Sequence, residues 1–162
     1  MNLKKLFDAQ NVLMERIEKE HPKHPDENRT GKRILALYVE VGECANEVRC
    51  FKFWSHKPAS PANVVLEEYV DGWHFVIELA LLIGWDQKEL VFPDYKYSPT
   101  AAFLDVFHSI TLLDEYRNHD AIDDLIESYI NLGDALGFTW EEIEKAYFEK
   151  NKINHIRQDN SY

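Results

Sequence analysis

The chain has 162 residues, of which 45% are hydrophobic, 13% aromatic and 29% charged, and its formal net charge at pH 7 is −11. This length and apolar content suit one globular domain, which we expect residues 1–162 to form. The negative charge argues against the basic face that nucleic-acid binding needs, and no apolar run reaches the roughly 18 residues of a membrane span. We therefore expect neither a nucleic-acid partner nor a membrane partner.

The start of the chain and its cysteines predict a cytoplasmic location. A basic pair begins the sequence, but acids follow it without a small-residue cleavage site, so no signal peptide is expected. Cys44 and Cys50 belong to one predicted helix, about 9 Å apart along its axis at ~1.5 Å per residue. That spacing is unsuited to an intrachain disulfide. With no targeting signal, a reducing cytoplasm is the expected environment.

The first half of the chain is predicted to form three helices. Residues 3–20 carry apolar side chains at a period of 3.6 residues, and the proline-containing stretch after them is typical of a loop. A second helix is predicted over about 32–54, where KPASPA ends it. Ser60 at the N-cap and Pro61 at the first helical position predict a third helix over about 61–84. The second half of this helix is apolar on nearly all sides, which indicates a central position.

Helical signals continue through the second half. Ser98-Pro99 is typical of a helix start, and Thr139 with Glu142 forms a capping-box pattern. Three further helices are predicted over about 98–117, 120–136 and 140–157. The whole pattern predicts an all-α fold, a compact helical bundle of five to six helices.

Acidic residues border the apolar stripes of the second and third helices. Glu40 and Glu43 are i, i+3 neighbours, and Glu68 and Asp71 repeat this spacing on the next helix. The short connection predicts antiparallel packing, which would let the two acid pairs face each other. Carboxylates in a partly apolar groove repel one another and are costly to desolvate, and divalent cations remove that cost. An all-oxygen ligand set favours Mg²⁺ or Mn²⁺.

The same acids have a simpler interpretation. Glutamate is a good helix former, and acids at helical spacing are usually a solvated helix face. On that interpretation the chain is a non-catalytic scaffold or regulatory protein that binds no divalent metal. Composition and spacing leave both interpretations open.

Two motifs resemble a known family. Glu40-x-x-Glu43 and Glu68-x-x-Asp71 resemble the metal-binding signature of the all-α nucleoside triphosphate (NTP) pyrophosphatases, which include MazG-type enzymes and dimeric dUTPases. The tail YFEKNKINHIRQDNSY is similar to the C-terminal motif of the dimeric dUTPases. The stretches FKFW at 51–54 and WHF at 73–75 are also similar to that family.

The resemblance implies an all-α NTP pyrophosphatase-like fold and a Mg²⁺-dependent dUTP diphosphatase. In the family reaction a metal-activated water attacks the α-phosphate, giving dUMP and pyrophosphate. Glu43 is the expected catalytic residue, and Mg²⁺, with Mn²⁺ as a substitute, is expected on Glu40, Glu43, Glu68 and Asp71. The alternative is a MazG-like house-cleaning pyrophosphatase for other or several nucleoside triphosphates.

Substrate contacts are implied at several points of the chain. Gln10 carries the donor and acceptor that the edge of uracil needs. Lys150 and Arg157 are suited to phosphates, the first as a point charge and the second through its planar fork. The remaining expected substrate contacts are Lys52, Trp54, Asn151, Asn154 and Tyr162.

The resemblance also implies a homodimer that takes dUTP, and it leaves cleavage of dUDP open. Aromatic residues in the middle of the chain would supply either the dimer interface or the core of the subunit. They are Phe92, Tyr95, Tyr97, Phe103 and Phe107.

Overall fold

A computed structural model describes residues 3–85 and 97–160. Over these residues the chain forms six α-helices and no strand, which confirms the predicted all-α bundle. The helices are α1 (Leu3–Glu20), α2 (Arg29–Val48), α3 (Ala62–Ile83), α4 (Pro99–Tyr116), α5 (His119–Ala135) and α6 (Trp140–Asp159). None of these helices is long and apolar enough to cross a membrane.

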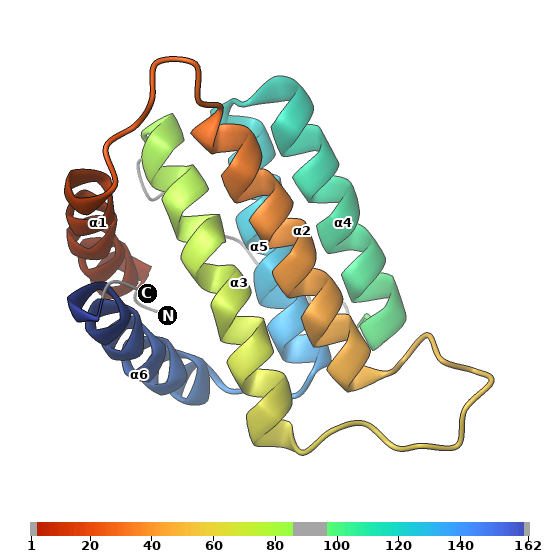
Figure 1. The fold of residues 1–162 in the computed structure, drawn as a ribbon. Helices are drawn as coiled ribbons and strands as arrows, with labels where there is room; N and C mark the ends of the chain where they lie inside the picture. The colour runs from red at the N-terminus through yellow and green to blue at the C-terminus, as the bar shows by residue number, and fades with distance from the viewer. Residues whose placement is uncertain (1–2, 86–96, 161–162) are drawn as a thin grey trace.

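Helix α3 is the centre of the bundle, as its apolar second half predicts. It contacts α1, α2, α5 and α6, while α4 packs between α2 and α5. In Figure 1, α1 and α6 lie on one side of α3, and α2, α4 and α5 lie on the other. Trp73, Val76 and Ile77 of α3 are completely buried. The two sides of the bundle are therefore joined through one apolar helix.

Helices α3 and α5 are joined by a reciprocal pair of tyrosines. The hydroxyl of Tyr69 donates to the backbone carbonyl of Tyr129, and the hydroxyl of Tyr129 donates to the carbonyl of Tyr69, both at 2.9 Å. The two rings stack with their centroids 5.0 Å apart. Each hydroxyl lies against a glycine of the opposite helix, Gly72 on α3 and Gly133 on α5. Both glycines therefore leave the space that this pair of hydrogen bonds needs.

Two predicted features around the α2–α3 connection are wrong. Helix α2 ends at Val48 rather than near 54, because Arg49 takes a left-handed conformation with φ 61° and its N–H bonds Ala45. Ser60 does not cap α3, since its hydroxyl donates to the carboxylate of Glu47 and Pro61 occupies the N-cap position. The segment between α2 and α3 is therefore a loop, which projects away from the bundle in Figure 1.

The other predicted helix starts lie close to their observed positions. The Ser98 hydroxyl accepts from the backbone N–H of Ala101, and both capping-box hydrogen bonds between Thr139 and Glu142 are present. Helix α5 is capped by Asn118, two residues before the predicted Asp120.

The cysteines and aromatic residues divide between core and surface. Cys44 is buried, Cys50 lies beyond the end of α2, and both are free thiols as predicted. Phe103 belongs to the core, and Phe107 is half-buried and stacks on Tyr38. Tyr97 is half-buried and packs against the core. The remaining two aromatic candidates, at positions 92 and 95, lie outside the described residues.

Candidate metal and nucleotide site

Three of the four predicted metal ligands lie together between α2 and α3. Glu40, Glu68 and Asp71 each place one carboxylate oxygen within 4.8 Å of the others. The i, i+3 spacing on α3 brings two of these side chains to one helix face, and the packing of α2 on α3 supplies the third. We call these three residues the carboxylate cluster. Glu43 is an exposed neighbour outside it, one helical turn beyond Glu40.

The negative charges of the carboxylate cluster are only partly neutralised by neighbouring cations. Burial first, and then the charges of Asp71, Glu43 and Glu68, raise the pKa of Glu40 to about 7. The pKa values of Glu68 and Asp71 are also raised, chiefly by burial, although the ammonium of Lys150 opposes the shift at Asp71. Hard oxygen ligands grouped at this spacing suit a hard divalent cation, which would relieve the repulsion.

The raised pKa of Glu40 predicts how stability depends on pH without metal. In the folded protein this carboxyl keeps its proton up to about pH 7, whereas the pKa of a glutamate in the unfolded chain is about 4.5. Between these pH values unfolding releases a proton, so the free energy of unfolding in EDTA should fall as pH rises. Urea unfolding at pH 5 and 7.5 checks this expectation. Glu40→Gln should flatten the dependence, and an equally steep dependence in the variant would contradict the assignment.

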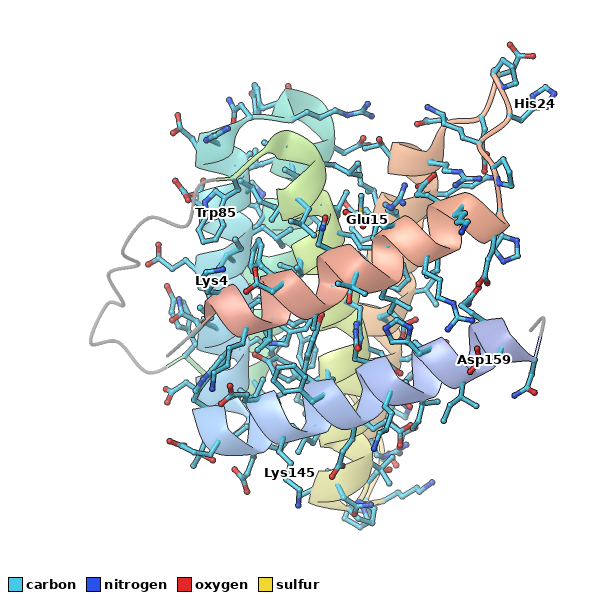
Figure 2. All side chains as sticks on the ribbon, turned by 90° about the vertical axis from the view of Figure 1, so that its left-hand side faces the viewer. Lys4, Glu15, His24, Trp85, Lys145 and Asp159 are labelled. Atoms are coloured by element: carbon cyan, nitrogen blue, oxygen red, sulfur yellow. The ribbon has the colours of Figure 1, made fainter. Side chains whose placement is uncertain are left out.

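Lys150 of α6 is a cation in direct contact with the cluster. Its ammonium lies 2.7 Å from Oδ2 of Asp71 and 3.0 Å from Oε1 of Glu67. The lysine side chain is only 11% exposed. Helix α6 is held beside α1 by Arg16, whose guanidinium donates to Asp159 at 2.6 Å and to the carbonyl of His155 at 3.1 Å. Figure 2 shows these two helices side by side, with Asp159 near the end of α6.

A cavity of about 470 Å³ opens next to the cluster, between α1, α2, α3 and α6. Glu40 and Asp71 form part of its wall, and Phe75 and Leu13 supply apolar surface. Three residues of the predicted phosphate-binding tail line it, as their i, i+4, i+7 spacing suggests: Lys150, Asn154 and Arg157. The wall also includes the basic side chains of Arg29, Lys32 and Arg33. Acidic and basic groups therefore meet in one cavity large enough for a small organic ligand.

Gln10 lines this cavity, but other residues already use its carbonyl oxygen. The Tyr147 hydroxyl donates to this oxygen at 2.7 Å, and Nδ1 of His74 lies 2.7 Å from the same atom. The Gln10 amide nitrogen donates to Glu78 at 2.9 Å. The structure thus places Gln10 at the wall of the cavity, as one member of a buried hydrogen-bond network.

His74 is a site residue that the sequence did not indicate. It is buried, stacks on Tyr147 and lines the cavity, and burial lowers its pKa to about 3. The imidazole is therefore neutral, and donation from Nδ1 to Gln10 leaves Nε2 as an acceptor. Within the described residues this buried Nε2 has no hydrogen-bond partner. The available signals were its place three residues after Asp71 and in the family-like stretch WHF at 73–75, but histidines on apolar helices are usually core residues.

Arg33 and Glu78 also belong to the site, although neither is among the predicted site residues. Nε of Arg33 donates to Glu78 at 2.7 Å, and Nη2 of the same guanidinium donates to Glu18 at 2.7 Å. Glu18 also pairs with Arg29 at 2.6 Å. These pairs hold two guanidinium groups at the wall of the cavity, and the residues involved come from α1, α2 and α3.

Four predicted substrate contacts lie apart from the cavity or outside the described residues. Trp54 is 65% exposed on the α2–α3 loop. Lys52, on the same loop, lies 5.3 Å from the centre of the Phe51 ring. Asn151 is buried in α6, and its amide nitrogen has no partner among the described residues. The fourth prediction, at position 162, falls outside the described residues.

Comparison with known proteins identifies the family. The model of the dUTPase family matches residues 2–162. No curated protein matches the chain. dUTPases are generally metal-dependent, and the carboxylate cluster is a group of acids that could hold a metal ion. Because the family match covers nearly the whole chain, the protein belongs to the dimeric all-α dUTPases and is a hydrolase that acts on dUTP.

Proposed function

We propose that the protein hydrolyses dUTP to dUMP and pyrophosphate with Mg²⁺ held by Glu40, Glu68 and Asp71, and by Glu43 at the edge of the cluster. The observation that carries this proposal is the carboxylate cluster, whose oxygens lie within 4.8 Å of one another and whose members Glu40 and Asp71 line a cavity that also has basic residues. Bound Mg²⁺ supplies a water of lowered pKa and neutralises charge on the phosphates, and Mn²⁺ can replace it.

The protein side chains divide the remaining tasks. Glu43 is exposed beside the cluster and accepts the proton of the attacking water. Arg157 binds phosphate oxygens through its planar guanidinium, and Lys150 binds them as a point charge. Asn154 lies between these two on the same face of α6 and contacts the sugar or the phosphates. The basic wall thus offsets the negative charge of the substrate, as the acidic composition of the chain requires.

The base is recognised at the end of the cavity formed by α1 and α3. Neutral His74 offers Nε2 as an acceptor, which suits the imide N–H of uracil and not the bare ring nitrogen of cytosine. Gln10 fixes the tautomer of His74 through the 2.7 Å contact at Nδ1 and lines the same wall. When cytosine binds, the buried Nε2 of His74 is left without a hydrogen-bond donor, and this cost favours uracil over cytosine.

A substrate panel tests this function. dUTP, dCTP, dTTP, dATP, dGTP and UTP are incubated with Mg²⁺ or with EDTA, and the products are separated. We expect metal-dependent release of dUMP and pyrophosphate from dUTP. Turnover of several bases would favour the MazG-like alternative and contradict the base assignment. Absence of any turnover would favour the scaffold interpretation.

We also propose that the active form is a homodimer built on the α2–α4 face. This face exposes Leu35 and Leu104, at 64% and 65%, and carries an apolar groove of about 310 Å³ between the two helices. Phe53, 94% exposed, and Trp54 extend the apolar surface onto the projecting loop. Apolar surface of this extent is typical of an interface, and a two-fold axis would use the same patch on both subunits. Lys52 and Trp54 would then reach the cavity of the partner subunit.

Mixing two inactive variants tests the shared site. Glu40→Gln and Trp54→Ala homodimers should each be impaired, but random re-association should restore about a quarter of the wild-type sites, since half of the dimers then hold one complete site. Activity of the mixture and sedimentation of the 19.1 kDa chain provide the measurement. A monomer at micromolar concentration, or a mixture no more active than its components, would contradict the proposal.

A further inference from the structure

Lys150 links the carboxylate cluster to an acid outside it. Its ammonium bonds Asp71 of the cluster and Glu67, whose carboxylate stands apart from the cluster and is 60% exposed. The lysine comes from α6 and both acids come from α3, so the bridge joins two helices. Because the lysine side chain is 11% exposed, its ammonium has little water to replace either carboxylate.

A metal on the cluster and this ammonium would compete for the same oxygens. Asp71 holds Lys150 through Oδ2 at 2.7 Å, and its carboxylate is also within 4.8 Å of Glu40 and Glu68. A divalent ion shared by these three acids would stand close to the ammonium, and like charges repel strongly where water is partly excluded. The lysine must then shift its contact away from Asp71, and Glu67 is already bonded to it.

We propose that, in the absence of metal, Lys150 is the counter-ion of Asp71 and so competes with the metal for this carboxylate. Glu67 is a positioning residue, which keeps the ammonium bound when the metal binds Asp71. This inference rests on the proposed function, because it requires a divalent metal at the cluster. Substrate phosphates, entering the cavity that Lys150 lines, draw the ammonium from Asp71 in the same way. Metal and nucleotide then strengthen each other's binding. Without nucleotide, the ammonium stays on Asp71 and metal binding is weaker.

A purely structural role for the bridge predicts a different result. If Lys150 only clamps α6 to α3, its removal lowers stability and leaves the metal affinity of the folded protein unchanged or weaker. If it competes with the metal, its removal strengthens metal binding. Removal of Glu67 has the opposite effect, because the ammonium is then held by Asp71 alone.

Calorimetric titration of Mg²⁺ into the nucleotide-free protein separates the two roles. Lys150→Met should bind Mg²⁺ at least about tenfold more tightly than the wild type, because the competing charge is partly buried. Glu67→Gln should bind it about twofold to fivefold more weakly, the range expected for a half-exposed ion pair. The double variant should match Lys150→Met, since Glu67 acts only through the lysine. Glu149→Gln removes the same charge beside Lys150 on α6 and serves as the matched control.

The outcomes distinguish this inference from the proposed function. The inference is overturned, and the metal site left intact, if Mg²⁺ binding in Glu67→Gln equals that in Glu149→Gln. It is likewise overturned if Mg²⁺ binding in Lys150→Met is unchanged or weaker relative to the wild type. Absence of Mg²⁺ binding in every variant, including Lys150→Met, overturns the inference together with the metal site. Binding that is detectable only in Lys150→Met supports the competition directly.

Discussion

Glu40→Gln should reduce kcat/KM for dUTP by about a thousandfold, which corresponds to about 4 kcal/mol of transition-state stabilisation. The substitution keeps the size of the side chain and removes one of the three proposed metal ligands, whose oxygens lie within 4.8 Å of one another. The same variant should be more stable than the wild type in EDTA above pH 7. Its neutral amide no longer faces the charges of Asp71, Glu43 and Glu68, which help raise the pKa of Glu40 to about 7.

Steady-state kinetics with Mg²⁺ and urea unfolding in EDTA measure the two effects. Glu115→Gln is the matched control, because this exposed glutamate near the end of α4 lies outside the cluster and the cavity. A Glu40→Gln enzyme with near wild-type kcat/KM would mean that the cluster is only a solvated acidic face. Loss of activity together with loss of stability in EDTA would indicate a folding defect instead of a missing ligand.

Gly72→Ala should lower the free energy of unfolding by about 3 kcal/mol, from overpacking together with a broken buried hydrogen bond. A methyl group at this position would overlap the Tyr129 hydroxyl oxygen and lie 2.9 Å from Cζ of the same ring. The tyrosine is completely buried, and its hydroxyl bonds the carbonyl of Tyr69 at 2.9 Å. It cannot shift without losing that bond and the stacking between the two rings.

Gly42→Ala is the control for Gly72→Ala, since both glycines are inside helices. Among the described residues nothing lies within 4 Å of a methyl group at Gly42, so alanine should stabilise α2 by up to about 1 kcal/mol. Urea unfolding with equal m-values compares the two variants. Equal effects of the two substitutions would show that the close contact of Gly72 with Tyr129 does not restrict the packing of α3 against α5.

The helices were predictable because their signals are local. Periodic apolar residues and caps such as Thr139 with Glu142 act within one or two turns. The predictions of the end of α2 and the cap of α3 were wrong because the local sequence signal there is compatible with two different structures. The Ser60 hydroxyl can cap a helix or bond a carboxylate, and in the structure it bonds Glu47. The end of α2 depends on Arg49, a residue type that rarely takes a positive φ.

The candidate site was predictable to a smaller extent. The spacing of Glu68 and Asp71 places both carboxylates on one face of α3, and the tail residues Asn154 and Arg157 follow the same rule on α6. Spacing within one helix does not determine which face of that helix packs against which neighbouring helix. Glu43 follows Glu40 by three residues, as Asp71 follows Glu68, but it remains exposed outside the cluster. Its catalytic role therefore stays a prediction.

The sequence by itself determined the helical class, the pairs of acids and the basic face of the tail, because each depends on a period of 3.6 residues within one helix. The tertiary structure decided which of these groups meet. Tyr147 bonds Gln10 from 137 residues away, and Lys150 bonds Glu67 across 83 residues. Such contacts depend on how the whole bundle packs around α3, and no local pattern records them. The buried acceptor of His74 and the contacts of Lys150 with Asp71 and Glu67 are therefore formed only when the four helices around the cavity are in place.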